Sequence, residues 1–338
     1  MKCAVFHAPA DLRVEQRPKP ELRGDDDVLL RVEAASICGT DLHILSDPPG
    51  HPATPGSILG HEYVGEVVSA GGAVSDLKAG DRVVVDPNIT CGGCAYCRRG
   101  SHNLCLNMTT LGIFRDGGFA EYNVAPARAL YRIDKRAPLD QAIFAEPLSC
   151  VLNAYGQAGL QMGDSVVILG AGPIGLLFQL LFRAGGAGRV GVAEISPVRA
   201  RLARECGADA VWNPRDGDMA AQVREWSGGL GADIVVDAVG VLLGQALKLV
   251  RRGGRVVLFG MNQTAHPEVS QYEVTRHEIS IIGTFIARRT FPQTVRTLES
   301  GRLPLEPLIT HRIGLDGIVG VLPALKTGEA VEVLIRPE

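Results

Sequence analysis

Short apolar runs separated by polar and turn-forming residues mark the first part of this 338-residue chain. Val-rich runs occupy residues 28–32, 64–68 and 83–85, and clusters of Gly, Pro and Asp lie between them. Runs of this length that are separated by turn-forming residues are typical of β-strands. The pattern therefore predicts a β-rich domain over residues 1–148.

In the middle of the chain, apolar strand-like runs alternate with longer helical stretches. The strand-like runs lie at residues 165–169, 190–193, 234–237, 255–259 and 279–283, and helical stretches lie at 174–184 and 197–206. Such alternation specifies a parallel sheet with covering helices. The sequence thus predicts an α/β protein whose second region, residues 149–284, is a doubly wound domain.

Composition and charge narrow the function classes. Apolar residues make up 46% of the chain, which is enough to bury a sizeable core. The 34 Lys and Arg nearly cancel the 37 Asp and Glu, so a basic nucleic-acid footprint is not expected. No apolar run approaches the roughly 20 residues that a membrane span needs. We expect a cytoplasmic protein with neither nucleic-acid nor membrane partners.

A glycine-rich turn follows the first strand of the doubly wound region. Gly170, Gly172 and Gly175 form the pattern GxGxxG, which encloses Pro173 and Ile174 and opens a Leu-rich helix. The three glycines permit a tight turn, close approach of a pyrophosphate, and close packing of helix on strand. The helix N-terminus also directs partial positive charge at the phosphates. The motif predicts a dinucleotide site. The alternative is that the glycines only form a turn between a strand and a helix.

An acidic residue ends the next apolar strand. Glu194 lies 19 residues past Gly175, where a carboxylate accepts hydrogen bonds from the adenosine ribose and repels a 2′-phosphate. The sequence therefore predicts NAD rather than NADP. Arg199 favours NADP instead, because a nearby guanidinium can accommodate the 2′-phosphate.

Four of the eight cysteines cluster in one segment, at about residues 88–108. Cys91, Cys94, Cys97 and Cys105 follow the spacing CxxCxxC, then seven residues before the fourth thiol. Four thiolates complete a tetrahedral zinc shell with no open position, so the site is expected to be structural. An iron–sulfur cluster stays open as an alternative, since cysteine spacing alone does not identify the metal.

A second set of candidate ligands is dispersed along the first region: Cys38, His61, Glu62 and Glu146. Taken singly, each is an ordinary core or surface residue. As a group they offer one sulfur, one imidazole and carboxylates. Such a set can hold zinc and leave one coordination position for a substrate.

The ordered motifs resemble the zinc-dependent medium-chain dehydrogenases of the alcohol dehydrogenase superfamily. They are Cys-Gly-Thr-Asp-Leu-His at 38–43, Gly-His-Glu at 60–62, the four-cysteine segment and the later GxGxxG. Glu-Pro-Leu-Ser at 146–149 is similar to the sorbitol and polyol dehydrogenase branch. The resemblance covers essentially the whole chain.

This resemblance implies a domain organisation. Residues 1–148 would form a GroES-like catalytic domain, residues 149–284 a Rossmann NAD-binding domain, and residues 285–338 a return to the catalytic domain. The active site would lie in the cleft between the two domains, and the protein would be a homodimer or homotetramer.

The resemblance also implies roles for the residues of the second metal site. Cys38 and His61 would be zinc ligands, Glu62 and Glu146 would complete the shell directly or through water, and Asp41 would orient the imidazole. Cofactor contacts would also come from Phe259, Gly260, Met261, Thr284 and Phe285.

Two further residues are candidates for a proton relay. Thr40 lies two residues after Cys38, and its hydroxyl is expected to take the proton of the alcohol. His43 would carry that proton to solvent. Zinc supplies the acidity, and the nicotinamide accepts the hydride.

The sequence departs from the polyol branch at one substrate-contacting position. Polyol dehydrogenases commonly carry an Arg where this chain has Ile286, although Arg288 and Arg289 follow closely. Residues 308–312, Leu-Ile-Thr-His-Arg, are instead similar to threonine dehydrogenases. The leading hypothesis is NAD-dependent oxidation of a secondary alcohol of a polyol, cyclitol or sugar derivative. The alternatives are an L-threonine 3-dehydrogenase and a noncatalytic NAD sensor, the latter predicting a degraded zinc shell.

Overall fold

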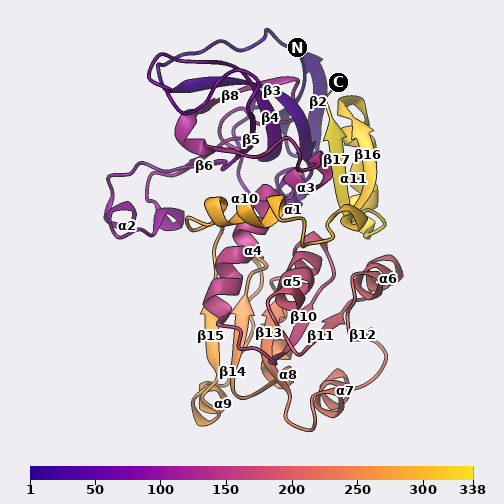
Figure 1. The fold of residues 1–338 in the computed structure, drawn as a ribbon. Coiled ribbons are helices and arrows are strands. Elements are labelled where there is room, and N and C mark those ends of the chain that lie inside the picture. Colours follow the sequence, from indigo (N-terminus) through magenta and orange to yellow (C-terminus); the bar gives the residue numbers. More distant parts are fainter. Residues whose placement is uncertain (338) are drawn as a thin grey trace. The chain divides into compact units, whose positions relative to one another are not determined.

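The computed structural model describes residues 1–337, which form two compact units. The first unit joins residues 1–149 with residues 287–337, and the second is Cys150–Ile286 (Figure 1). The α/β class and the doubly wound sheet are confirmed. No helix of the described chain combines the length and apolarity needed to cross a membrane.

A seven-stranded sheet forms the centre of the first unit. Its order is β16-β17-β3-β4-β5-β9, and β8 also pairs with β3. All pairs are antiparallel except β16 with β17. The strands are β3 (Asp27–Ser36), β4 (Glu62–Ala70), β5 (Arg82–Val85), β8 (Tyr122–Pro126), β9 (Leu130–Arg132), β16 (Ile309–Gly314) and β17 (Glu332–Arg336). Two strands that follow the second unit in the sequence thus complete the sheet of the first.

Short elements surround this sheet. The strands β1 (Lys2–Ala8) and β2 (Asp11–Gln16) form a hairpin, and β6 (Asn88–Ile89) pairs with β7 (Thr109–Thr110). The helices are α1 (Gly39–Ile44), α2 (Ala95–Arg98), α3 (Leu139–Ala142), α10 (Phe291–Glu299) and α11 (Ile318–Thr327). The 3₁₀ turns are η1 (His102–Leu104), η2 (Ala127–Ala129), η3 (Glu306–Leu308) and η4 (Leu315–Gly317).

One apolar core holds the first unit together. Val28, Leu30 and Val32 alternate along β3 and are buried in the same cluster as Val83 and Val85 of β5. Alternate residues of a strand point to one face of the sheet, so the period-two pattern places these side chains inside. Helix α11 packs on the same core.

The second unit is built on a six-stranded parallel sheet of order β12-β11-β10-β13-β14-β15. Its strands are β10 (Ser165–Leu169), β11 (Arg189–Ala193), β12 (Ala210–Trp212), β13 (Ala232–Asp237), β14 (Val250–Leu258) and β15 (Ser280–Gly283). Because the strand order reverses between β10 and β13, the carboxyl ends of these two strands flank the crevice where doubly wound proteins bind nucleotides.

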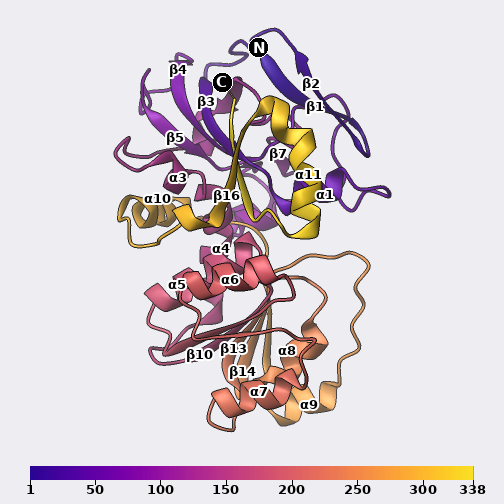
Figure 2. The same ribbon diagram turned by 90° about the vertical axis from the view of Figure 1, so that its right-hand side faces the viewer.

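Helices cover both faces of this sheet. Met219 and Val223 of α7 and Leu249 of α8 pack in one cluster with Val167 and Leu169 of β10. Helices α5 and α6 contact the β10–β12 half, and Figure 2 shows them on the other side of the sheet. The helices are α4 (Ala145–Ala158), which passes from the first unit into the second, α5 (Pro173–Ala184), α6 (Pro197–Glu205), α7 (Met219–Trp226), α8 (Leu243–Leu249) and α9 (Gln271–Arg276).

Candidate active site

The pairing of β3 with β4 brings the dispersed ligand candidates together. In this register Ser36, the last residue of β3, lies opposite Glu62, the first residue of β4. Cys38 follows Ser36 by two residues, and His61 precedes Glu62. The metal-binding atoms of Cys38, His61 and Glu62 lie within 4.8 Å of one another. Three side chains separated in sequence therefore converge at one end of two neighbouring strands.

The turn after β3 fixes the thiol of this group. Cys38 caps the N-terminus of α1, and its backbone N–H donates to Oδ2 of Asp41 at 2.9 Å. Asp41 is thereby held one turn into the helix with its carboxylate facing back. The Sγ of Cys38 lies 3.7 Å from Oγ1 of Thr40.

Asp41 also faces the imidazole of His61. Its Oδ1 lies 3.8 Å from Nδ1 of His61, and both side chains are buried. Neither atom has a hydrogen-bond partner among the described residues. Since Nδ1 is turned toward a carboxylate, the favoured neutral tautomer carries its proton there and leaves the Nε2 lone pair for a metal.

The buried acidic side chains around Cys38 and His61 favour binding of a cation. Burial raises the pKa of Asp41 to about 6, and burial with the charge of Glu62 raises the pKa of Cys38 well above its usual value. Burial lowers the pKa of His61, but the charges of Asp41 and Glu62 outweigh it and leave the pKa raised. Buried acidic groups around one imidazole and one thiol fit a bound Zn²⁺, which pairs with sulfur, nitrogen and oxygen ligands alike.

Glu146 lies close to this group but outside its tightest set. It is buried in the first turn of α4, and its charge acts on both Cys38 and His61. It does not belong to the three residues whose ligand atoms lie within 4.8 Å of one another. Direct binding of zinc by Glu146 stays a prediction.

The two proton-relay candidates occupy different surroundings on α1. Thr40 is half-buried beside Cys38, whereas the side chain of His43 is exposed. Thr40 is thus positioned next to the ligand group and His43 next to solvent. This is the order that an outward relay requires.

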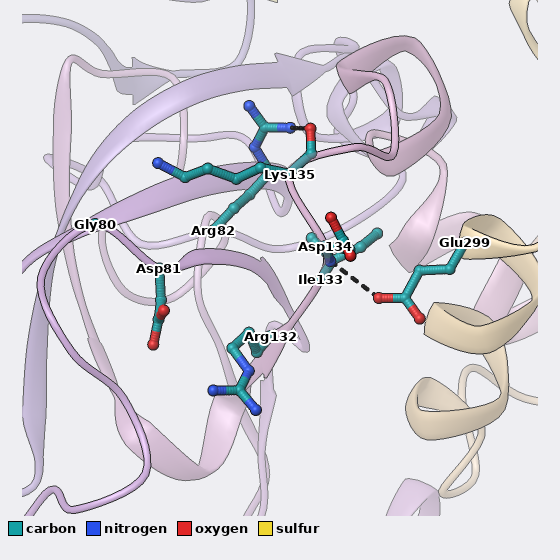
Figure 3. A pocket seen from close by; sticks show the side chains of 8 residues that line it. All are labelled: Gly80, Asp81, Arg82, Arg132, Ile133, Asp134, Lys135 and Glu299. Carbon is teal, nitrogen blue, oxygen red and sulfur yellow. Dashed lines mark hydrogen bonds between the residues drawn. The ribbon is translucent and has the colours of Figure 1, made fainter.

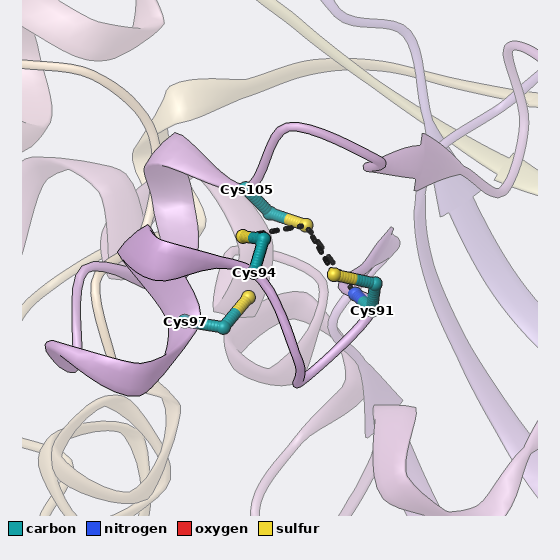
Figure 4. Close-up of side chains that lie close together, drawn as sticks. All are labelled: Cys91, Cys94, Cys97 and Cys105. Carbon is teal, nitrogen blue, oxygen red and sulfur yellow. Dashed lines mark hydrogen bonds between the residues drawn. The ribbon is translucent and has the colours of Figure 1, made fainter.

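The four remaining cysteine candidates surround a single point (Figure 4). Their sulfurs lie within 4.8 Å of one another, with 3.5 Å between those of Cys91 and Cys105. Backbone N–H groups of Cys94 and Gly93 lower the pKa of Cys91 to about 6, whereas removal from water raises that of Cys97 to about 11. Amide donors aimed at sulfur favour thiolates, so the segment fits a closed tetrahedral metal site.

The glycine turn has a backbone geometry that glycine adopts without strain and other residues do not. Gly170 adopts a φ of +97°, and a Cβ at Gly175 would lie 1.9 Å from the carbonyl oxygen of Gly170. Gly172 caps α5, with Pro173 at its first position and Ile174 following it. Any side chain at Gly175 would force the strand and helix apart, so the turn depends on glycine.

Glu194 is buried and anchors the glycine turn. Its Oε2 accepts the N–H of Ala171 at 2.7 Å, while its Oε1 accepts the N–H groups of Ile195 and Ser196. An ionised carboxylate offers about four lone-pair sites, so Oε2 retains one for a further donor. The guanidinium of Arg199 lies beside the turn, with Nη1 4.0 Å from where a Cβ of Gly172 would be.

Further cofactor candidates lie at the ends of β14 and β15. The ring of Phe259 packs edge-on against Phe178, Met261 is exposed, and the hydroxyl of Thr284 donates to the carbonyl of Leu258. Gly260 packs so closely on Gly240 that a Cβ there would lie 2.3 Å from the Gly240 nitrogen. Glycine at position 260 therefore lets the segment after β14 pack directly on the segment after β13.

Two residues that organise this edge escaped the sequence analysis. Asp237, at the end of β13, accepts the N–H groups of Val239, Gly240 and Leu242. Asn153 donates through Nδ2 to the carbonyl oxygens of Phe285 and Ile286. An acid as the last residue of a buried strand was a usable signal for Asp237, whereas nothing in the local sequence marks Asn153.

The two arginines near Ile286 are engaged elsewhere. Arg288 donates to the hydroxyl of Ser101 at 3.2 Å, and Arg289 lies 2.6 Å from Nε2 of His102. Both partners belong to the cysteine segment. Because both guanidiniums make these contacts, neither is positioned to replace the substrate-binding arginine that is missing at Ile286.

A charged cavity of about 370 Å³ lies beside β5 and β9 (Figure 3). Its lining residues are Gly80, Asp81, Arg82, Arg132, Ile133, Asp134, Lys135 and Glu299. The carboxylate of Glu299 accepts the N–H of Asp134 across it, at 2.9 Å. None of these lining residues is a candidate ligand or cofactor contact.

Two family models match the chain. One, described as an alcohol dehydrogenase GroES-like domain, matches residues 24–135. The other, described as a zinc-binding dehydrogenase, matches residues 173–300.

Individual relatives are similar over nearly the full length. Sorbitol dehydrogenase of Bacillus subtilis is 32% identical over 321 residues, which cover 94% of this chain and 91% of the relative. L-threonine 3-dehydrogenase of Pyrococcus abyssi is 36% identical over 332 residues, 94% of this chain and 92% of the relative. A crystal structure described as a zinc-binding dehydrogenase of Sinorhizobium meliloti 1021, bound to NADP, superposes with a TM-score of 0.93 at 36% identity and covers 99% of both chains.

Proposed function

Because this chain belongs to the zinc-dependent medium-chain dehydrogenases, which transfer hydride between an alcohol and a nicotinamide cofactor, we propose that it oxidises a secondary alcohol of a polyol, cyclitol or sugar derivative with NAD. Its GroES-like and Rossmann domains and its use of zinc and a nicotinamide cofactor are as expected from the motifs. We assign the catalytic domain to residues 1–148 and 285–338 and the cofactor domain to 149–284.

One observation carries the proposal. Cys38, His61 and Glu62 present their ligand atoms to one point, and Asp41 lies behind the imidazole. A noncatalytic NAD sensor would have no reason to keep this buried and electrostatically unfavourable set. We therefore assign Cys38, His61 and Glu62, with Glu146 directly or through water, to the catalytic zinc, and the four clustered cysteines to a structural zinc.

The chain's own residues divide the chemistry among them. Zinc, when bound, supplies the Lewis acidity that lowers the pKa of an alcohol. Asp41 keeps the His61 lone pair on Nε2, and Thr40 accepts the proton of the substrate hydroxyl. His43, exposed on the same helix, passes it to solvent. A bound nicotinamide cofactor would accept hydride from the carbon that bears the substrate hydroxyl, so the products would be a ketone, the reduced cofactor and one proton.

The preference for NAD rests on Glu194. Its remaining lone pair suits a ribose hydroxyl, and its charge repels a 2′-phosphate. The Sinorhizobium meliloti relative holds NADP, and Arg199 beside the turn is the group that favours a phosphate here. Measuring kcat/KM for NAD and for NADP tests this preference. In a Glu194→Gln variant, the ratio of the two values should shift toward NADP. A wild-type preference for NADP would overturn it.

L-threonine 3-dehydrogenase activity is the second candidate. The Pyrococcus abyssi relative supports it, as does the Leu-Ile-Thr-His-Arg stretch at 308–312. A threonine substrate needs an anionic group for its ammonium and a cationic group for its carboxylate. Arg312 is paired with Asp140 at 2.7 Å, so its guanidinium is already engaged.

A single preparation tests both candidates. NADH formation is followed over polyols, cyclitols, simple secondary alcohols and L-threonine, and zinc is counted in the same sample. We expect two zinc ions per chain and turnover on a polyol-type substrate. Cys38→Ser should lose one zinc and all turnover, whereas Cys206→Ser, the matched thiol control, should lose neither. Two zinc ions without turnover on any of these alcohols would overturn the substrate class.

We further propose that the protein is a cytoplasmic homodimer or homotetramer. The edge strand β15 of the six-stranded sheet supports assembly, because Ile281 is exposed on it and its outer backbone groups face no neighbouring strand of the described chain. Light scattering would give the mass directly. A monomer at micromolar concentration would overturn the assembly.

A further inference from the structure

The loop that follows β13 is held by one buried carboxylate. Asp237 is the last residue of β13 and only 2% exposed. Its Oδ1 accepts the N–H groups of Val239 and Gly240 at 2.9 and 2.8 Å, and its Oδ2 accepts the N–H of Leu242 at 2.8 Å. Because a carboxylate removed from water must be hydrogen-bonded, these three bonds fix the course of residues 238–242.

The main chain around Asp237 joins the two neighbouring strands at the same level. Leu169, the last residue of β10, lies opposite Asp237, and its carbonyl oxygen accepts the N–H of Ala238 at 3.1 Å. On the other side, the carbonyl oxygen of Asp237 accepts the N–H groups of Phe259 and Gly260, which follow β14. Asp237 therefore connects the carboxyl ends of three adjacent strands, β10, β13 and β14.

The loop also lies against the glycine turn. A Cβ at Gly170 would lie 2.8 Å from Cγ2 of Val239, so this side chain packs on the first glycine of the GxGxxG motif. Gly240 has a φ of +94°, and a Cβ there would lie 2.6 Å from the carbonyl carbon of Gly260. The loop thus contacts the segments that follow both neighbouring strands. It lies at the crevice between β10 and β13, where doubly wound proteins bind nucleotides.

Packing of the apolar core does not account for this loop. Leu242 packs against the core, but Val239 and Val241 are 46% and 42% exposed. A loop that only joined β13 to α8 would gain little by holding two apolar side chains in water. Loops fixed on a rigid scaffold that present apolar side chains at a crevice are typical of ligand-binding sites.

We propose that Asp237 is a positioning residue for the nicotinamide cofactor. By holding residues 238–242 against the glycine turn, it keeps the crevice between β10 and β13 in the conformation that binds the dinucleotide. Without these bonds the loop would adopt other conformations, and the apparent affinity would fall with the fraction of the protein that is competent to bind. The inference rests on the proposed placement of the cofactor at the glycine turn.

Two substitutions at position 237 remove different numbers of these hydrogen bonds. The amide of Asp237→Asn keeps one oxygen, which can accept from Val239 and Gly240. Its Nδ2 would then face the N–H of Leu242, and two donors cannot pair. Asp237→Ala removes all three bonds. Loop order and cofactor affinity should therefore fall from the wild type to the Asn variant and again to the Ala variant.

Asp233 provides the matched control on the same strand. It is the second residue of β13, at the opposite end from Asp237. Its Oδ2 accepts the N–H of Ser165 at 2.7 Å, and its Oδ1 accepts from Nε of Arg251. Whichever way the amide of Asp233→Asn turns, it loses one of these bonds. A carboxylate with a merely structural role should change the stability of the protein at either position without changing its affinity for the cofactor.

The test measures binding in the absence of turnover. Calorimetry gives the Kd of each purified full-length variant for the cofactor, NAD or NADP, that the wild type binds more tightly. Hydrogen exchange followed by mass spectrometry reports the protection of the amides at residues 238–242. Urea unfolding gives the stability, and zinc is counted in the same preparations.

The expected results differ between the two ends of β13. Asp237→Asn should raise the Kd about two- to tenfold and Asp237→Ala about tenfold or more, because one bond is lost in the first and all three in the second. Amides at 238–242 should exchange faster in the same order. Asp233→Asn should keep the wild-type Kd although its stability falls. Every variant should keep the zinc content of the wild type.

The outcomes that overturn the inference differ from those that overturn the cofactor site. A wild-type Kd in both variants at position 237 would show that the loop does not set cofactor affinity. An equal rise of the Kd in Asp233→Asn would also overturn the inference, because it would trace the effect to a general loss of stability. If Asp237→Ala fails to fold, Asp237→Asn decides alone. A wild-type protein that binds neither NAD nor NADP would instead overturn the proposed cofactor site, and this inference with it.

Discussion

Replacing Asp41 by Asn is expected to weaken zinc binding at the proposed catalytic site without unfolding the protein. Asn has the same shape, and its Oδ1 can still accept the N–H of Cys38, which now bonds Oδ2 of Asp41 at 2.9 Å. That choice turns the Nδ2 amide toward Nδ1 of His61. Two donors cannot face each other, so the imidazole shifts its proton to Nε2. The lone pair available to zinc then points the wrong way.

The magnitude follows from the geometry. Oδ1 of Asp41 and Nδ1 of His61 lie 3.8 Å apart, and two unit charges at that distance would interact by about 4 kcal/mol at an effective dielectric of 20. Because the neutral imidazole carries only a partial charge at Nδ1, this value is an upper limit for the loss. Removing a carboxylate behind a metal-bound histidine typically lowers metal affinity or activity 10–100-fold, or about 1.4–2.7 kcal/mol. We expect zinc affinity at this site to fall within that range, with turnover falling at least as far.

The assay is chelator competition for zinc together with steady-state kinetics. The cysteine site provides an internal reference, since its affinity should not change. Asp76→Asn, which removes an exposed carboxylate of the same unit, is the control and should match the wild type. Zinc affinity and kcat within about threefold of wild type in Asp41→Asn would refute the tautomer argument.

Three further predictions follow from the same geometry. Thr40→Ala should lower turnover by about a hundredfold or more with both zinc ions retained, and near-normal turnover would remove Thr40 from the mechanism. Gly175→Ala should raise the KM for NAD about tenfold or more without loss of zinc, because its Cβ would lie 1.9 Å from the Gly170 oxygen; unchanged NAD binding by calorimetry would contradict this. Burial raises the pKa of Asp86 from 3.8 to about 6, so the folded protein holds this proton more tightly than the unfolded chain. Stability is therefore lost as pH rises from about 4 to 6, and Asp86→Asn should recover up to about 3 kcal/mol in urea unfolding at pH 7 but nothing below pH 4. An equal gain at both pH values would count against burial as the cause.

Local patterns predicted the parts of the fold that are encoded locally. The alternation of buried strands and helices specified the doubly wound sheet, and the glycines of the first turn follow from a positive φ at Gly170 and the close approach at Gly175. Glu194 was recognised by its place after a strand. Its second role, accepting the N–H of Ala171 and so bracing the turn, depends on a side-chain rotamer that no sequence pattern reveals.

The residues that support the zinc site could not be predicted in the same way. Ser36 is an ordinary residue within a strand, and its hydroxyl reaches the carboxylate of Glu62 only because β3 pairs with β4. Asn153 similarly finds its partners at Phe285 and Ile286, more than a hundred residues away. Such contacts are fixed by the register of distant strands and by packing, which single-sequence periodicity does not determine.

The place of β17 in the sheet also bears on how the protein is made. Strand β3 leaves the ribosome long before Glu332 is added, and at roughly 5–20 residues per second the intervening chain takes about 15–60 s to synthesise. During that interval the nascent sheet has an open edge where its last partner will dock. Completion of the seven-stranded sheet is therefore a late event in biogenesis, reached only after the second unit has emerged from the ribosome.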